Sequence, residues 1–517
     1  MSQLRIRSAP VAALLIILAG AALLRFVLLD TRELFRDEAA SWLLASSAWG
    51  DIIGRSASEP YPPLFAFALK AWIALLGDGP AALRTLSASA GVAMVGVTWV
   101  WAREAIGTRA AHLAASLVAL SPLAIANARD ARMYALESLA AVFAWWLLWR
   151  LLTGRGPRAR RRFVVLGAAL GVACELWTLP TGFAVFALQL AVVGVLAARR
   201  QPGARSAGLA LAVGFASFVP WLPRLLAAAT DGRPFWTPVP DPAALLATLG
   251  VTFGGWDPSP GWIAVLPLAV LAAVGFRALS RSGSAGQLAT ALAVMAGAAL
   301  VLAWWLVSLW RPAYDSRYLG AAVPPLALAI AAGAESVAAQ LRRTGWTRRV
   351  VGAAAAALLV LVGAGTATFE ANWVLGGGLP PARAAAAILQ ERVQAGDIVL
   401  VSDAQSYFPL AYLFERRSAP IELPAPLRYW RSGLEPAYTG GDLVASDRTI
   451  GPDASLRPGE LAGLSATGSI WLVAITDPDG EVAGFTPLVE GRVTELERLE
   501  VTDHGDRGLI IRLRPSP

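Results

Sequence analysis

The chain has 517 residues, of which 56% are hydrophobic and 15% charged, with a formal net charge of +8 and a mean hydropathy of +0.55. A water-soluble globular protein cannot bury so many apolar side chains, so the composition predicts a polytopic helical membrane protein. The positive charge is almost wholly arginine, with Lys70 the one lysine, and it indicates helix orientation, not nucleic-acid binding. Cys174 is the one cysteine, which excludes an intramolecular disulfide and a thiolate metal site.

Hydropathy predicts about eleven transmembrane helices, all within a domain formed by residues 1–370. The apolar spans fall near residues 10–29, 81–101, 110–127, 133–152, 163–178, 180–198, 206–223, 261–277, 287–309, 318–338 and 349–369. The first span follows Arg5 and Arg7 and has no small-x-small cleavage site after it. It therefore resembles a signal sequence that is retained as an anchor.

The arginines between the spans indicate how the chain is oriented. With a cytoplasmic N-terminus, every inside loop is short and basic, as the positive-inside bias requires. These arginines lie within 103–109, 155–162, 199–205, 277–281 and 342–349. We therefore expect a multi-pass protein of the plasma (inner) membrane with a cytoplasmic N-terminus and, after an odd number of spans, an extracytoplasmic C-terminus.

The composition changes at residue 371, after which acids outnumber bases. The segment 382–393 has a helical pattern, and residues 396–403 (GDIVLVSD) resemble a buried strand. Ser469–Thr476 and Gly508–Leu513 have strand patterns too. Residues 371–517 are thus expected to form a soluble α/β domain on the outer face. The sequence contains no GxGxxG, P-loop or HExxH motif, and His112 and His504 are too far apart in the topology to form a metal pair.

The first outer loop, residues 30–80, is where polar side chains first gather, with Asp37 and Glu38 at its start. The segment EAASWLLASSAW follows and places Trp42 and Trp49 seven residues apart. This spacing predicts a short helix in the membrane interface, with both indoles on one face at the level of the lipid headgroups. Taken alone, an acid such as Asp37 at the start of a helix is more often a cap than a catalytic group.

A second polar group, Arg129-Asp130-Ala131-Arg132-Met133-Tyr134, lies at the outer end of a span, where the positive-inside bias disfavours arginine. Arg132 and Tyr134 are expected to enter the next helix near its N-terminus, a position that favours an anion. An ion pair with Asp130, or an arginine that reaches the lipid phosphates, explains the pattern about equally well.

A third group, Arg311, Asp315, Arg317 and Tyr318, again places arginine and tyrosine at the start of a span on the outer side. The three groups repeat one combination of carboxylate, arginine and tyrosine at a single membrane surface. Glu175 falls near that surface and is expected to be structural.

The first third of the chain resembles the GT-C superfamily of membrane glycosyltransferases. Within it, the chain is most similar to the family-39 group, which includes protein O-mannosyltransferases and the aminoarabinose transferase of lipid A. The matching residues are Asp37-Glu38, Pro62-Pro63-Leu64, Leu83-Arg84, Ser121-Pro122, ARDARMYAL at 128–136, Arg317-Tyr318 and Pro324-Pro325. Order and spacing match over residues 30–140, the later spans match only in style, and the tail hardly matches.

The resemblance implies that Asp37 is the general base, with Glu38 beside it. It also implies that arginines and tyrosines bind the lipid phosphate of the donor. The candidates for that role are Arg129, Arg132, Tyr134, Arg317 and Tyr318, with Glu59 and Tyr61 as supporting residues of the first loop. Relatives usually have Lys or His before the Pro-Pro pair, whereas this chain has Tyr61, so a phosphate contact there must be weaker or come from elsewhere.

A sugar on a polyprenyl phosphate carries its own acidic leaving group, so the reaction needs arginines more than a second acid. One carboxylate suffices to deprotonate the acceptor hydroxyl, and a single displacement inverts the anomeric centre. We therefore expect an inverting transferase that acts on a lipid, glycan or protein acceptor. A divalent cation is possible.

A flippase-like transporter of lipid or glycan is the alternative, although its polar groups belong at the bilayer midplane and the spans here look almost free of charge. A membrane-anchored scaffold is a further alternative, but it leaves the outer arginines unexplained.

Overall fold

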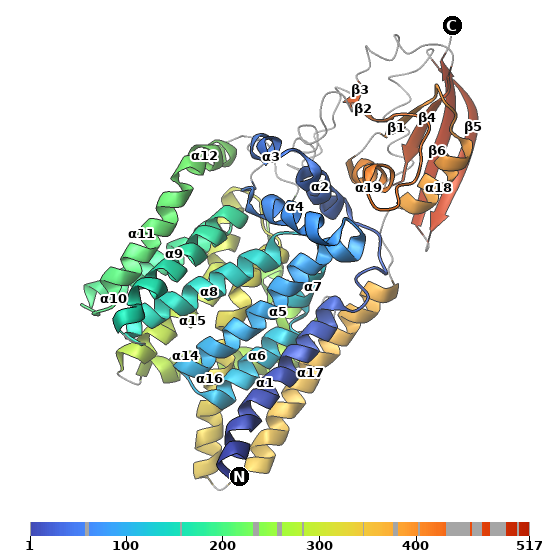
Figure 1. Ribbon diagram of the computed structural model, residues 1–517. Coiled ribbons are helices and arrows are strands. Elements are labelled where there is room, and N and C mark those ends of the chain that lie inside the picture. Colours follow the sequence, from blue (N-terminus) through green and yellow to red (C-terminus); the bar gives the residue numbers. More distant parts are fainter. Residues whose placement is uncertain are drawn as a thin grey trace.

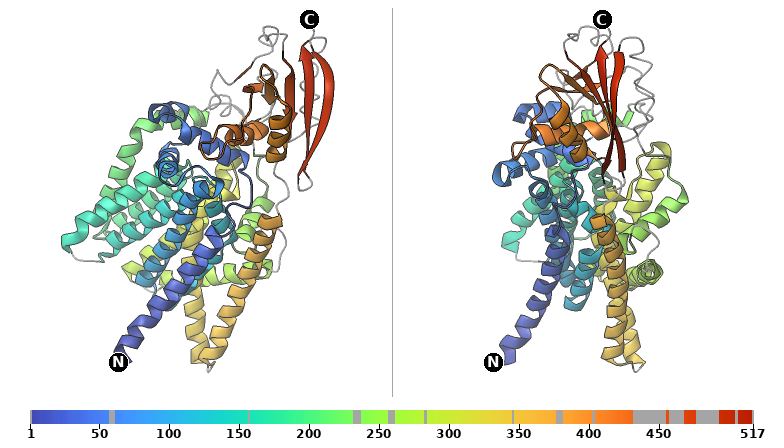
Figure 2. Two further views of the ribbon diagram at one scale, coloured as in Figure 1. Left: turned by 45° about the vertical axis from the view of Figure 1, so that its right-hand side comes forward. Right: turned by 90° about the vertical axis from the view of Figure 1, so that its right-hand side faces the viewer.

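The structure, a computed structural model, is a helical bundle with a small β-sheet at one end (Figure 1). The N-terminus lies at the opposite end of the bundle (Figures 1 and 2). The described residues are 2–56, 61–155, 158–230, 237–255, 261–281, 284–344, 346–375, 381–401, 404–430, 455–456, 468–475, 493–503 and 506–515.

Long apolar helices pack side by side to form the bundle. They are α1 Ser2–Phe26, α5 Pro80–Ala105, α6 Thr108–Leu120, α7 Pro122–Arg129, α8 Tyr134–Thr153, α9 Arg161–Thr178, α10 Gly182–Ala198, α11 Ala204–Phe218, α12 Leu222–Thr230, α13 Pro242–Phe253, α14 Trp262–Arg281, α15 Ala285–Trp310, α16 Val323–Arg343 and α17 Arg348–Leu375. Short 3₁₀ turns are η1 Arg158–Arg160, η2 Val219–Trp221 and η3 Ser316–Ala322. Helix α13 lies inside a segment that the sequence presents as an outer loop.

Fewer helices are long and apolar enough to cross a membrane than the eleven spans predicted from hydropathy. Each predicted span overlaps a helix or a helix pair. In the described part of the chain, seven helices are long and apolar enough to cross a membrane, or eight if the bent pair α6–α7 is one span. The predicted eleven are therefore not confirmed: the apolar part of α1 is only Val11–Phe26, and α10 has 17 residues.

The span made of α6 and α7 is bent by 55° at Ser121-Pro122. Proline ends α6 because it has no N–H to donate and clashes with the preceding turn. Ser121 then caps α7, because its hydroxyl accepts from the N–H of Ala124 at 3.3 Å. The carbonyls that α6 leaves open are bonded by the buried Arg25, which donates to the oxygens of Val118 and Ala119, both at 3.1 Å. A buried arginine thus stabilises a helix break next to the candidate site.

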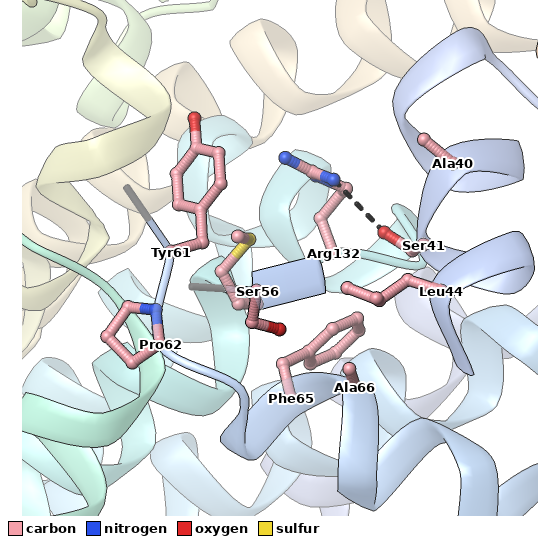
Figure 3. Close-up of a pocket in the computed structure, with 10 residues that line it drawn as sticks. Ala40, Ser41, Leu44, Ser56, Tyr61, Pro62, Phe65, Ala66 and Arg132 are labelled. Atoms are coloured by element: carbon pink, nitrogen blue, oxygen red, sulfur yellow. Dashed lines mark hydrogen bonds between the residues drawn. The ribbon is translucent and has the colours of Figure 1, made fainter. Parts of the chain in front are cut away.

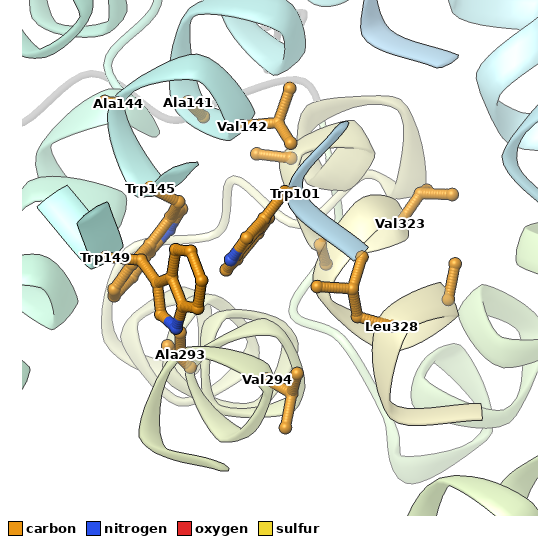
Figure 4. Close-up of a cluster of buried hydrophobic side chains, with 14 of the residues drawn as sticks. Trp101, Ala141, Val142, Ala144, Trp145, Trp149, Ala293, Val294, Val323 and Leu328 are labelled. Carbon is orange, nitrogen blue, oxygen red and sulfur yellow. The ribbon is translucent and has the colours of Figure 1, made fainter. Parts of the chain in front are cut away.

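The centre of the bundle is filled by indoles packed against alanines. Trp101 and Trp149 are fully buried where α5, α8, α15 and α16 meet (Figure 4). The indole N–H of Trp149 donates to the Thr290 hydroxyl at 2.9 Å, so its polar edge is satisfied inside the bundle.

The described residues of the tail form a six-stranded sheet of order β3-β2-β1-β4-β6-β5. The strands are β1 Ile398–Val401, β2 Leu427–Trp430, β3 Ser455–Leu456, β4 Ile470–Ala474, β5 Val493–Asp503 and β6 Asp506–Pro515, with helices α18 Ala382–Arg392 and α19 Ala404–Glu415. Strands β1, β2, β3 and β4 are parallel, and β6 is antiparallel to β4 and β5. The predicted helix and three predicted strands are confirmed. The pattern missed α19, β2, β3 and β5.

Three short helices of the first loop lie at the end of the bundle that carries the sheet: α2 Arg36–Ser46, α3 Trp49–Ser56 and α4 Leu64–Leu76 (Figure 1). The prediction of one interfacial helix with both indoles on one face is wrong, because the helix stops after Ser46. Trp42 is buried, whereas Trp49 is 57% exposed. The ring of Trp42 contacts Tyr412 of α19 edge-on, with centroids 5.2 Å apart, so this loop packs against the tail domain.

Candidate active site

The first turn of α2 carries the two acids of the first loop, and their side chains have different surroundings. The helix begins after Phe35, whose N–H donates to Oε2 of Glu38 at 3.0 Å. Glu38 therefore closes the start of the helix, and the alternative in which Asp37 is the cap is wrong. Asp37 is left to point elsewhere.

Glu38 is buried in an ion pair with Arg84 of α5. The Nε and Nη2 of Arg84 lie 2.7 and 2.6 Å from the two carboxylate oxygens. Oε1 also accepts from the N–H of Ala131 at 2.9 Å, and Arg84 donates to the carbonyls of Leu29 and Glu33. Both carboxylate oxygens of Glu38 are thus used to connect α2, α5 and the segment before α8.

Asp37 faces three guanidinium groups. Its Oδ1 lies 2.9 Å from Nη2 of Arg36, and its Oδ2 lies 3.3 Å from Nη1 of Arg317. Burial raises the pKa of Asp37, but the charges of Arg132, Arg36 and Arg317 outweigh it and bring the pKa down to about 2. With a pKa of about 2, the Asp37 carboxyl group is ionised at neutral pH. Because 12% of its side chain is exposed, a substrate can still contact it.

Arg132 lies just before α8 and not inside it, because the helix begins at Tyr134. Its Nη1 donates to the carbonyl of Asp37 at 3.1 Å and to the hydroxyl of Ser41 at 3.0 Å. Its guanidinium lies over the rings of Tyr61 and Tyr134, at 5.5 and 5.9 Å from their centroids. These contacts hold a cation at the surface of α2, one turn from Asp37.

A small hollow of about 40 Å³ lies between α2, α4 and Arg132 (Figure 3). The polar part of its wall comes from Arg132, Ser41 and Tyr61, and Figure 3 shows the guanidinium bonded to Ser41. The apolar part comes from Leu44, Pro62, Phe65, Ala66 and Met133, among others. The wall is therefore amphiphilic, with a cation at one side and hydrocarbon at the other.

The turn η3 brings Arg317 and Tyr318 to the same place from the far part of the sequence. The rings of Tyr134 and Tyr318 lie 5.7 Å apart, and Arg317 lies over both. The carbonyl of Arg317 accepts from Asn127 of α7 at 2.9 Å. A Cβ on Gly320 would come within 2.7 Å of that Asn127 amide, so a glycine lets η3 approach α7.

Arg129, also named from the sequence, is buried and donates to the carbonyl of Val27 at 3.1 Å, at the end of α1. Glu59 lies outside the described residues. The structure thus brings together Asp37, Arg132, Tyr134, Arg317, Tyr318 and Tyr61.

Asp130, which the sequence analysis treated only as an ion-pair partner, lies close enough to Glu38, Arg317 and Arg84 to feel their charges. Burial and the charge of Glu38 raise its pKa to about 7, against the lowering effect of Arg317 and Arg84. A carboxyl group that titrates near neutrality next to several arginines is typical of functional sites. In the sequence, the position of Asp130 between Arg129 and Arg132 was the feature that could have drawn attention to it.

The expectation that the spans are almost free of charge is wrong. Glu137 of α8 and Glu175 of α9 are both buried in the bundle, as are Arg25 and Arg84. Gln189 of α10 donates to Oε2 of Glu175 at 3.0 Å, while the Oε1 atoms of both glutamates have no hydrogen-bond partner. In the described part of the chain, no group of three or more His, Cys, Asp or Glu side chains is arranged to hold a metal ion.

Comparisons with known proteins give a consistent fold. The family described as dolichyl-phosphate-mannose-protein mannosyltransferase matches residues 60–223. ArnT from Cupriavidus metallidurans in the apo state is 15% identical, with a TM-score of 0.64 over 98% of each chain. ArnT bound to undecaprenyl phosphate, also 15% identical, gives 0.62 over 96% of this chain and 97% of that one. The oligosaccharyltransferase AglB from Archaeoglobus fulgidus is 13% identical and gives 0.55 over 97% of this chain and 74% of its own. No curated protein matches the sequence.

Proposed function

We propose that this chain, which has the fold of the GT-C superfamily of membrane glycosyltransferases, transfers a sugar from a polyprenyl phosphate to a hydroxyl acceptor with inversion. The observation that carries the proposal is the meeting of Asp37 with Arg132 and Arg317 beside an amphiphilic hollow. The three residues come from α2, from the start of α8 and from η3. Such an arrangement supplies a base and two cations at one point.

Arg132 and Arg317 are proposed to bind the phosphate of the donor, assisted by the hydroxyls of Tyr134 and Tyr318. A guanidinium can give a phosphate two parallel hydrogen bonds, which are among the stronger ones in proteins. The apolar wall of the hollow next to Arg132 would hold the start of the isoprenoid chain, because Leu44 and Phe65 line the same hollow as the guanidinium. The relative bound to undecaprenyl phosphate supports this class of donor.

Asp37 is proposed as the general base. As the acceptor oxygen forms its bond to the anomeric carbon, the bond from that carbon to the phosphate oxygen breaks. The hydroxyl proton passes to Asp37, and the polyprenyl phosphate leaves with the electron pair of the broken bond. The guanidinium groups of Arg132 and Arg317 stabilise the negative charge that the phosphate gains. Glu38 is reassigned in this proposal to positioning, because Arg84 and two backbone N–H groups occupy its carboxylate.

The site is proposed to face the outside of the plasma (inner) membrane, with the N-terminus in the cytoplasm and residues 371–517 extracytoplasmic. A nucleotide sugar would have to carry its charged diphosphate across about 30 Å of hydrocarbon to reach an outer site. A lipid-linked sugar arrives already within the membrane. The sugar and the acceptor class (lipid, glycan or protein) are to be identified by assay.

The test is transfer by the purified protein, given a panel of polyprenyl-phosphate sugars with lipid, glycan and peptide acceptors. We expect transfer from at least one lipid donor and none from nucleotide sugars alone. Transfer from a nucleotide sugar without a lipid carrier would overturn the proposed donor.

A transporter remains the second candidate, because Glu137 and Glu175 lie buried with open oxygens inside the bundle. Intramembrane carboxyl groups of this kind are common in transport pathways. The assay is lipid translocation in proteoliposomes by the wild type and by Glu175→Gln. Translocation that is lost in this variant and survives in Asp37→Asn would favour transport over transfer.

A further inference from the structure

The tail domain packs against the first loop through one continuous apolar core. Ala39, Trp42 and Ala45 of α2 share this core with α18, α19 and the sheet. The contact is therefore made by the same helix that carries Asp37 in its first turn.

Helix α2 is held from three sides. Arg84 of α5 holds its first turn through Glu38. Lys70 of α4 holds its last turn, donating to the carbonyls of Ala45 and Ser47 at 3.3 and 2.6 Å. The third side is Tyr412 of α19, whose ring packs edge-on against Trp42.

The end of α19 is fastened to the transmembrane part by Asp78, in the short loop between α4 and α5. The Asp78 carboxylate accepts from the N–H of Arg417 at 2.7 Å, from the N–H of Ser418 at 3.0 Å and from the Ser418 hydroxyl. Its own carbonyl accepts from the hydroxyl of Tyr412 at 2.9 Å. Asp78 is 2% exposed, so these bonds are shielded from water. One residue thus fixes the turn after α19 and the ring that contacts Trp42.

We propose that the tail domain positions α2, the helix that carries Asp37. Asp78 and Tyr412 hold α19 in contact with Trp42, and this contact fixes the position of α2 and of Asp37. This inference rests on the proposed function for its effect on turnover. Asp78, Tyr412 and Trp42 are positioning residues and do not touch the reacting groups.

The substitutions that test this are Asp78→Ala, which removes the acceptor of three hydrogen bonds, and Asp78→Asn, which keeps one oxygen and should restore part of the effect. Tyr412→Phe keeps the ring on Trp42 but loses the hydrogen bond to the Asp78 carbonyl and the one accepted from Arg416. The matched control is Arg383→Gln, because Arg383 joins the same two parts of the protein at 3.0 Å from Glu33, which precedes α2, and its side chain is 59% exposed.

Hydrogen exchange of the full-length protein in detergent is the first measurement. In Asp78→Ala we expect the amides of α2, residues 36–46, to exchange about tenfold faster or more, while α5 and α8 keep the wild-type rates. Arg383→Gln should leave α2 unchanged. The inference is overturned if residues 416–418 exchange faster in Asp78→Ala while α2 does not, or if both variants behave alike.

Turnover is the second measurement. The base is on α2, whereas Arg317 of the proposed donor site is held by Asp315 and Asn127. Arg132 bonds the Asp37 carbonyl and the Ser41 hydroxyl, so it should move with α2 and affect donor binding as well. Asp78→Ala should therefore lower kcat about tenfold or more and raise the KM for the donor by a smaller factor. An equal change in both parameters would contradict positioning of the base. If the wild type transfers no sugar, the proposed function fails, and the exchange experiment still decides whether the domain orders α2.

Discussion

The guanidinium of Arg317 lies between two carboxylates, with Nη1 3.3 Å from Oδ2 of Asp37 and Nε 3.1 Å from Oδ2 of Asp315. The longer contact is the one to the proposed base. A donor phosphate that takes up Nη1 would weaken this ion pair and let the pKa of Asp37 rise, since Arg317 is one of the charges that lower it. The donor would then make Asp37 a stronger base.

The substitution Arg317→Gln tests this relationship. Removing one of the three cations should raise the pKa of Asp37 from about 2 toward its usual value. The carboxylate then gains a proton at a higher pH, so the acid limb of the profile of kcat/KM against pH should move upward. The measurement is that profile between about pH 3 and 7. An unmoved acid limb would show that Arg317 does not act on Asp37.

Asp37→Asn and Glu38→Gln should separate chemistry from folding. Asn cannot accept the proton, so Asp37→Asn should lower kcat by about 10²–10⁴-fold. It also removes the ion pairs with Arg36 and Arg317, so the melting temperature should fall, but the protein should still fold. Glu38→Gln breaks a buried ion pair with Arg84, a change that typically costs about 3–5 kcal/mol of folding free energy. Thermal unfolding and turnover of both variants check this. Near-normal turnover of Asp37→Asn would exclude Asp37 as the base.

Arg132→Ala should weaken use of the donor by about 1.5–3 kcal/mol, the usual range for a hydrogen bond to a charged group. Arg132→Lys should recover only part, because lysine lacks the planar fork that lies over Tyr61 and bonds Ser41. The measurement is the KM for the polyprenyl-phosphate sugar, with acceptor KM as the control. An Ala variant with unchanged donor dependence would place the phosphate elsewhere.

Asp130 should make stability depend on pH near neutrality. Its pKa is raised to about 7 in the folded protein, so the folded state binds the proton more tightly than the unfolded chain does. The resulting stabilisation is complete below about pH 4 and is lost as the pH rises to about 7, with a slope of at most about 1.4 kcal/mol per pH unit. The melting temperature of the wild type should therefore fall relative to that of Asp130→Asn between pH 5 and 7.5. A parallel pH dependence of the two proteins would contradict this.

Reporter fusions should place Arg160 in the cytoplasm and the C-terminus outside, as the arginine-rich loops predict. A periplasmic phosphatase reporter and a cytoplasmic fluorescent reporter at each point give opposite signals in that topology. If both positions report the same compartment, the proposed outer site is wrong.

Much of the site could be predicted from the sequence, because local rules place its parts. Each span predicted from hydropathy overlaps a helix in the described part of the chain, and Arg132 and Arg317 stood out as arginines on the side predicted to face outward. The bend of 55° at Ser121-Pro122 was not predicted, because hydropathy presents residues 110–127 as one continuous span.

The different surroundings of Asp37 and Glu38, and so their different proposed roles, could not be predicted in this way. The two acids are neighbours in the sequence. Only the tertiary packing pairs Arg84 of α5 with Glu38 and Arg317 of η3 with Asp37. The pKa of Asp130 likewise depends on charges from three separate segments.

Trp42 shows the same limit for the fold. Its spacing from Trp49 suits a membrane interface, but the tail domain covers Trp42 with Tyr412, a residue 370 positions further along the chain. Periodicity determines which face of a helix is apolar, and it does not say whether lipid or protein will cover that face. The sequence alone therefore determined the helices and the side chains that carry charge. The tertiary structure decided which charges meet and which apolar faces are buried, because those outcomes depend on contacts between distant segments.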